Sequence, residues 1–154
     1  MDASLVNPFI EGALYILDTT ALVKVKPEPI FLKKETTPLG DITGMLNMDG
    51  DISGSIAVSF YENSILGVVS AMFGEEMTEM NEEIDDAVGE ISNMIAGHVT
   101  TKIAEMDKKV KIKLAGVVSG ENSVVEHIKG ASHVLVIPFK TTKGRFFIEI
   151  AIRD

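Results

Sequence analysis

The feature that most constrains the fold is a hairpin pattern at residues 41–60, which read DITGMLNMDGDISGSIAVSF. One set of alternate residues runs from Ile42 to Leu46, and the alternation resumes between Ile52 and Phe60. The dipeptide Asp49-Gly50 lies between the two halves, and Asp-Gly is a strong turn signal. Two strands joined by so short a connection run antiparallel, so we expect an antiparallel sheet to form around this hairpin.

Helical patterns stand on both sides of the hairpin. The first begins either with Asn7-Pro8 as N-cap and first position, or near Asp2 with a kink at Pro8. A second follows the hairpin as ILGVVSAMF and ends at Gly74. A long helix is predicted from about residue 80 to residue 107, with Asn81 as its N-cap.

The remaining segments read as strands. Residues 21–34 alternate but contain Pro27 and Pro29, which places them at a sheet edge, and Pro138 suggests the same for its strand. The last three strands are predicted at residues 110–118, 132–139 and 145–152. The order is therefore α-β-β-β-α-α-β-β-β, without βαβ alternation. We expect an α/β fold of the α+β type, with long helices packed on a mainly antiparallel sheet.

Charge and composition exclude several function classes. The 154 residues fit a single domain over 1–154, and the net charge of −9 argues against nucleic acid and anionic membrane as partners. No segment reads as a signal peptide or a membrane span. The chain has no cysteine, which fits a cytoplasmic protein and rules out thiolate chemistry.

The long helix has two faces when residues 84–99 are placed at about 100° per residue. The apolar face consists of Ile84, Val88, Ile91, Ile95 and Val99. The opposite face, a sector of about 60°, carries Asp86, Glu90, Asn93 and Gly97. Asparagine is a poor helix former, and glycine in a helix costs about 1 kcal/mol relative to alanine. A merely solvated face explains these residues poorly, so we favour a contact surface, on which Gly97 would let another molecule approach.

The stretch DDAVGEISNMIAG at residues 85–97 resembles the active helix of the CheC/CheX/FliY family of chemotaxis phosphatases. That family's pattern is Asp or Ser, three residues, Glu, two residues, Asn, and Asp86, Glu90 and Asn93 match it. The likeness extends to ISGSIAVSF, SILGVVSAMFG and VVSG elsewhere in the chain. A single Glu-x-x-Asn motif resembles the CheX type. Where the family often has a proline after this helix, the chain reads Leu114-Ala115-Gly116, which predicts a changed turn or strand start.

The resemblance implies a phosphatase for the aspartyl phosphate of a CheY-like receiver protein. Asn93 would orient the attacking water, since an amide both donates and accepts hydrogen bonds without adding negative charge. Glu90 would form a salt bridge with the receiver's lysine, and Asp86 would extend this contact. The chain would need no cofactor or metal of its own, because the receiver supplies Mg²⁺. The resemblance also implies a homodimer formed by joining sheet edges. The proline-marked strands make some edges unsuitable, so we expect another strand to pair.

Two alternatives compete with this interpretation. The chain could be a non-catalytic receiver-binding or dimerisation module of a signalling or flagellar complex, or it could be a phosphatase for a receiver unrelated to chemotaxis. Asp49, Asp51 and Ser53 imitate the start of a calcium loop, but Phe60 stands where such a loop needs a glutamate, so a hairpin turn is favoured. The three histidines, His98, His127 and His133, have no metal-ligand spacing, and His98 is predicted to be a hydrogen-bonded structural residue.

Overall fold

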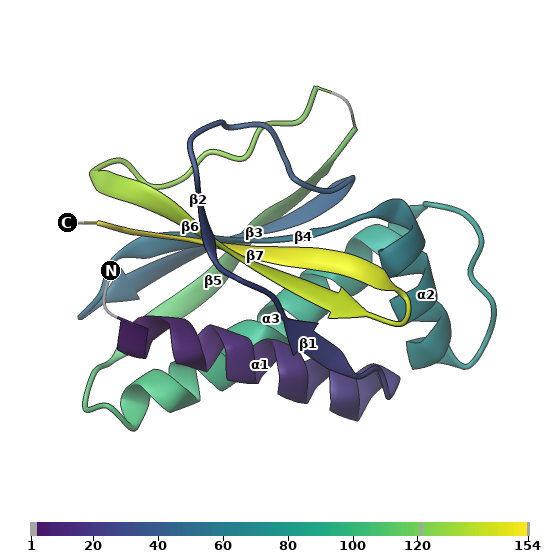
Figure 1. Ribbon diagram of the computed structural model, residues 1–154, viewed down its shortest axis with the longest axis horizontal. Helices are drawn as coiled ribbons and strands as arrows, with labels where there is room; N and C mark the ends of the chain where they lie inside the picture. The colour runs from purple at the N-terminus through teal and green to yellow at the C-terminus, as the bar shows by residue number, and fades with distance from the viewer. Residues whose placement is uncertain (1–2, 121, 154) are drawn as a thin grey trace.

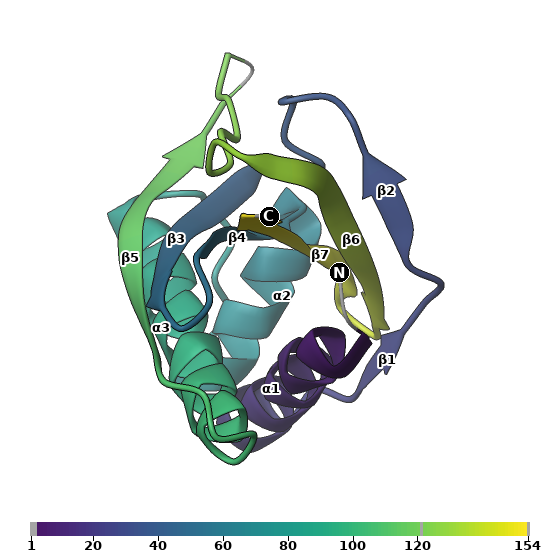
Figure 2. The ribbon, with the colours of Figure 1, turned by 90° about the vertical axis from the view of Figure 1, so that its left-hand side faces the viewer.

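Three helices cover one face of a 7-stranded antiparallel sheet in the computed structural model, which describes residues 3–120 and 122–153 (Figure 1). The helices are α1 (Ala3–Ala21), α2 (Glu62–Phe73) and α3 (Glu82–Ala104). The strands are β1 (Val25–Pro27), β2 (Phe31–Lys33), β3 (Ile42–Gly50), β4 (Gly54–Phe60), β5 (Val110–Ser119), β6 (Ala131–Thr141) and β7 (Gly144–Arg153). Figure 2 shows the sheet curving around the helices. The predicted α+β class is confirmed.

The predicted hairpin forms the centre of the sheet. The strand order is β1-β6-β7-β4-β3-β5, with β2 also paired to β6, and β3 pairs with β4 from Ile42–Phe60 to Met48–Gly54. The turn, however, lies at residues 51–53 rather than at Asp49-Gly50. Gly50 remains paired with Val110 at a φ of 118°, which extends β3 beyond the predicted turn. A hairpin turn, and not a calcium loop, therefore occupies this segment.

The proline positions led to one correct prediction and one wrong prediction about the edge of the sheet. The segment predicted as one edge strand forms two short ones, because β1 ends at Pro27 and Pro29 separates it from β2. The prediction that Pro138 marks an edge strand is wrong, since β6 is paired on both sides. The carbonyl of Pro138 accepts a hydrogen bond from Glu28 N–H at 2.9 Å, in the gap between β1 and β2. A residue without an N–H is tolerated there because the neighbouring ladder is interrupted.

The main core lies between the helices and the concave face of the sheet. Phe60, Phe146 and Phe139 stack in series, with ring centroids 5.1 and 4.8 Å apart, and all three are fully buried. Helix α1 contains Pro8, so the alternative of a helix starting before Pro8 is correct; Asp2 itself lies outside the described residues. No helix in the described part of the chain is long and apolar enough to cross a membrane.

Candidate active site

Helix α3 has a capped N-terminus and charged residues near both ends. The side chain of Asn81 accepts a hydrogen bond from Ile84 N–H at 3.2 Å, which confirms the predicted N-cap. Three acidic residues stand in the first turn and Lys102 in the last, as the helix dipole favours. The helix ends at Ala104, three residues before the predicted end at 107, and Asp107 has left-handed backbone at a φ of 61°.

The two predicted faces of α3 are present in the structure. The apolar face is buried along its whole length, and its members are Ile84, Val88, Ile91, Ile95 and Val99. The opposite face is exposed and carries the four residues singled out in the sequence, Asp86, Glu90, Asn93 and Gly97. We call these four residues the α3 stripe. The structure thus brings the predicted site residues to one surface; their chemical roles stay predictions.

The stripe is held close to the sheet by a contact between α3 and β3. Ser92, the neighbour of Asn93, is fully buried, and its hydroxyl donates to the carbonyl of Val88 at 2.7 Å. Its side chain lies directly against Gly44, where an added Cβ would overlap the Ser92 hydroxyl. The missing side chain at Gly44 therefore sets the distance between α3 and β3, and this distance fixes the position of Asn93 relative to the sheet.

The two glycines that flank the motif, Gly89 and Gly97, have different structural environments. Gly89 is buried, and a Cβ there would lie 3.1 Å from Leu114 Cδ2 on β5, so close helix–sheet packing explains it. Gly97 is exposed, and a Cβ there would meet nothing within 4 Å. Packing within the described residues therefore does not explain why position 97 is a glycine, as predicted from the sequence.

A shallow groove runs beside the stripe, between α3 and β5. Its volume is about 400 Å³, and it is lined by Asp85, Asp86, Gly89, Glu90, Asn93, Leu114 and Val117. Leu114 belongs to the segment where the sequence predicted a changed turn or strand start, and a change relative to the family stays a prediction. Strand β5 runs through the segment, and its pairing with β3 shifts there, with Leu46 opposite Leu114 and Met45 opposite Gly116. Ala115 is thus the extra residue of a β-bulge, a device that re-aims neighbouring side chains.

The polar groups of the stripe have no partner among the residues that the structure describes. Across residues 3–120 and 122–153, the side chains of Asp86, Glu90 and Asn93 form no hydrogen bond and no ion pair. Two carboxylates and an amide on one surface can bind a cationic group and a water molecule of a partner. No group of three potential metal ligands occurs in the described residues.

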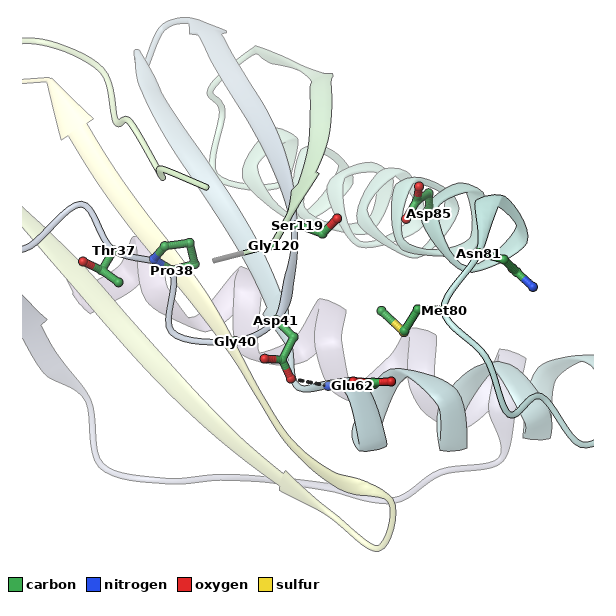
Figure 3. Close-up of a pocket in the computed structure, with 10 residues that line it drawn as sticks. All are labelled: Thr37, Pro38, Gly40, Asp41, Glu62, Met80, Asn81, Asp85, Ser119 and Gly120. Carbon is green, nitrogen blue, oxygen red and sulfur yellow. Dashed lines mark hydrogen bonds between the residues drawn. The ribbon is translucent and has the colours of Figure 1, made fainter. Parts of the chain in front are cut away.

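A second pocket, of about 560 Å³, opens near the start of α3 (Figure 3). Asp41, Glu62 and Asp85 place three carboxyl groups around it, and Asp41 Oδ2 accepts a hydrogen bond from Glu62 N–H at 2.7 Å. This bond caps α2, whose own N-cap residue makes no side-chain bond. Glu90 and Asn93 do not line this pocket, so it lies apart from the predicted site residues.

Sequence reasoning missed a buried polar network on the sheet face turned away from the helices. Glu149 Oε2 accepts from Lys33 Nζ at 2.8 Å, and Glu149 Oε1 lies 2.9 Å from His127 Nε2. His127 Nδ1 lies 2.7 Å from Ser55 Oγ, which accepts from Ile128 N–H at 2.8 Å. The order serine–histidine–carboxylate imitates a hydrolase triad. Ser55 is only 2% exposed, however, so no substrate reaches it and the network is structural. The sequence signal is Glu149, a lone charge inside the apolar run FFIEIAI.

His98 departs from its prediction. Its ring stacks on Tyr15 of α1 with centroids 5.1 Å apart. Its Nε2 atom is buried and has no hydrogen-bond partner among the described residues, so the expectation of a hydrogen-bonded histidine is wrong for this atom. Ring stacking between α1 and α3 is what holds this side chain.

Known proteins resemble this chain over most of its length. The family described as "Chemotaxis phosphatase CheX" matches residues 42–140. A Thermotoga maritima protein described as "CheY-P phosphatase CheX" is 33% identical, over 100% of this chain and 99% of that protein. A CheC-like superfamily protein from Shewanella sp. PV-4 has a TM-score of 0.90 at 31% identity, over 100% of both chains. A chain in the crystal structure of the CheX–CheY–BeF3–Mg²⁺ complex from Borrelia burgdorferi has a TM-score of 0.78 at 25% identity, over 97% of each chain.

Proposed function

The chain belongs to the CheX family of chemotaxis phosphatases, and on this premise we propose that it hydrolyses the aspartyl phosphate of a CheY-like receiver protein. The Thermotoga relative is described as acting on CheY-P, and the Borrelia relative forms a complex with CheY. The observation that carries the proposal is the α3 stripe, in which exposed Glu90 and Asn93 lie one helical turn apart on a helix fixed to the sheet. Since receivers act in the cytoplasm, we expect the chain to act there.

The proposed role of Asn93 is to orient the attacking water. Phosphoryl transfer proceeds through a loose transition state, so positioning and electrostatics supply most of the catalysis. The Asn93 amide can accept a hydrogen bond from the water and donate one, and it brings no negative charge near the phosphoryl oxygens. The Mg²⁺ ion that offsets the phosphoryl charge would come from the receiver, and no metal site on this chain enters the mechanism.

The proposed role of the remaining stripe residues is docking. A carboxylate at Glu90 is repelled by a phosphoryl group but attracts a lysine, so we assign it an ion pair with the receiver's active-site lysine. Asp86, one turn earlier, extends this contact. Gly97, one turn after Asn93, leaves open space in which the receiver's backbone can approach α3.

The competing function is receiver binding without turnover. Both functions use the same stripe, but only catalysis requires a water-orienting amide at position 93. The test is to mix the chain with a panel of receivers phosphorylated by acetyl phosphate and to follow the loss of phosphate. Faster loss than in the receiver alone supports the phosphatase. Binding to a beryllofluoride-activated receiver without acceleration would instead establish the non-catalytic module.

We further propose a homodimer that joins through strand β2. The structure splits the proline-containing segment, so β2 itself contains no proline and pairs only with β6 among the described strands. Ile30, Phe31 and Leu32 at this edge are 44%, 42% and 56% exposed. An edge strand with exposed apolar side chains is a template for pairing with a second copy.

A further inference from the structure

A second groove lies on the other side of the stripe, between the end of α2 and the first half of α3. Its volume is about 630 Å³, and it is lined by Met72, Phe73, Glu75, Glu83, Asp86, Ala87 and Glu90. Asp86 and Glu90 thus line this groove and also the groove beside β5. The stripe is therefore a ridge with a hollow on each side.

Three of the side chains that line this α2–α3 groove, Met72, Phe73 and Ala87, are apolar. Phe73 is the last residue of α2 and is 51% exposed, although most phenylalanines of the chain are buried. Gly74 then turns the chain away through a left-handed cap at a φ of 67°, which leaves the ring uncovered. The small side chain of Ala87 faces the same hollow. An exposed aromatic ring in a hollow beside a candidate active site is typical of a protein-binding anchor point.

The rim of the groove is acidic and unneutralised. The acidic lining residues are Glu75, Glu83, Asp86 and Glu90, and all four are exposed. In the described parts of the chain none of the four forms an ion pair. No lysine or arginine lines the groove. The occupant that complements it carries an apolar side chain flanked by basic ones. A second copy of this chain is acidic overall, with a net charge of −9, so a partner with a basic surface complements the four carboxylates better.

We propose that the α2–α3 groove is a second docking site for the phosphorylated receiver, where an apolar side chain flanked by lysine or arginine packs against Phe73. This inference rests on the proposed function, since it places the same partner on both sides of the stripe. The part of the groove formed by Phe73, Glu75 and Glu83 lies outside the stripe, and we place it away from the phosphoryl group that Glu90 and Asn93 approach. Its interactions are equal in the ground state and the transition state, so they determine KM and leave kcat unchanged.

The first experiment compares Phe73→Ser with the matched control Val124→Ser, in which a side chain of similar exposure, 47%, is removed from the loop after β5. KM and kcat are measured on the receiver that the wild-type chain dephosphorylates. We expect Phe73→Ser to raise KM about tenfold, the loss typical of an interface anchor, without changing kcat. Val124→Ser should change neither constant.

The outcomes separate the two proposals. An active wild type whose KM stays within about twofold in Phe73→Ser overturns the groove alone, since an anchor residue costs more than that. A wild type that accelerates dephosphorylation of no receiver overturns the phosphatase and the groove with it. Because Phe73 is half-exposed at a helix end, the variant should fold, and circular dichroism checks this.

The second experiment tests the acidic rim through charge reversal. The double variant Glu75→Lys, Glu83→Lys should raise KM and flatten its dependence on ionic strength, because charge attraction at exposed sites is screened by salt. Glu35→Lys, the same change on the loop between β2 and β3, is the control and should behave as wild type. A double variant with the wild-type KM and salt dependence would overturn the basic flank of the proposed occupant.

Discussion

At position 93 a neutral amide stands in an acidic surface, and the mechanism predicts a specific kinetic signature for its removal. Asn93→Ala should abolish accelerated dephosphorylation while leaving the affinity for a beryllofluoride-activated receiver nearly unchanged, since the amide acts chiefly in the transition state. Glu90→Ala should weaken that affinity as well, because it removes a ground-state ion pair. Single-turnover kinetics and binding titrations measure the two effects. An Asn93→Ala protein with full activity would refute the water-orienting role.

At position 97 stability and activity should move in opposite directions. Gly97→Ala should stabilise the chain by up to about 1 kcal/mol, because the site is helical, exposed and open around the new methyl group. Gly97→Leu should also fold. Both variants should act more slowly on the phosphorylated receiver, the leucine variant far more so, since the added atoms occupy the space of the partner. Urea unfolding and phosphate release provide the two measurements. Equal activity of wild type and Gly97→Leu would show that the receiver docks elsewhere.

Among the helices and strands, the contact between α3 and β3 makes the stripe sensitive to a residue that the partner never touches. Gly44→Val should push α3 away from β3 through Ser92, destabilise the fold by about 1–3 kcal/mol as overpacked cores do, and lower kcat. Gly116→Ala is the control, because an added Cβ there meets nothing within 4 Å. Denaturant midpoints and kcat are the readouts. Unchanged kcat in a folded but destabilised Gly44→Val protein would show that the depth of α3 does not matter.

The elements that sequence reasoning predicted well are those with a strong local signal. The α3 helix combines a capping asparagine with a buried apolar face, and both are visible in the order of residues. Its misplaced end and the misplaced hairpin turn are errors of local backbone, at Asp107 and Gly50, where left-handed conformations are not encoded by hydrophobic pattern. The edge prediction from Pro138 failed for a different reason. The missing N–H of Pro138 is tolerated because the partner strand has a gap there, and that gap lies far from Pro138 in the sequence.

Over the whole molecule, the features that sequence analysis missed depend on contacts between residues far apart in the sequence. The buried network joins Lys33, Ser55, His127 and Glu149, residues from four distant segments, on the sheet face that the helices leave uncovered. Only Glu149 can be recognised from the local sequence, as a charged residue in an apolar strand. Both of its carboxylate oxygens have partners, so the charge is tolerated. The candidate site was predictable because all its key residues lie on one helix, whereas its two grooves also need residues of α2 and β5.

The proposed dimer is a property of the whole molecule and predicts a solution mass of twice the 16.6 kDa chain. Edge-to-edge pairing of β2 with its copy is antiparallel under twofold symmetry, and it would cover Phe31 and Leu32 on both chains. Leu32→Lys should dissociate the dimer, because pairing would bring two like charges together at an apolar edge. Val124→Lys is the control, an equal change at an exposed apolar residue outside β2. Light scattering over a range of concentrations measures the mass.

Since α3 packs on the concave face of the sheet and β2 lies at its edge, the dissociated variant should keep its phosphatase activity. A wild-type chain that stays monomeric at high concentration, or a Leu32→Lys protein that stays dimeric, would contradict pairing through β2.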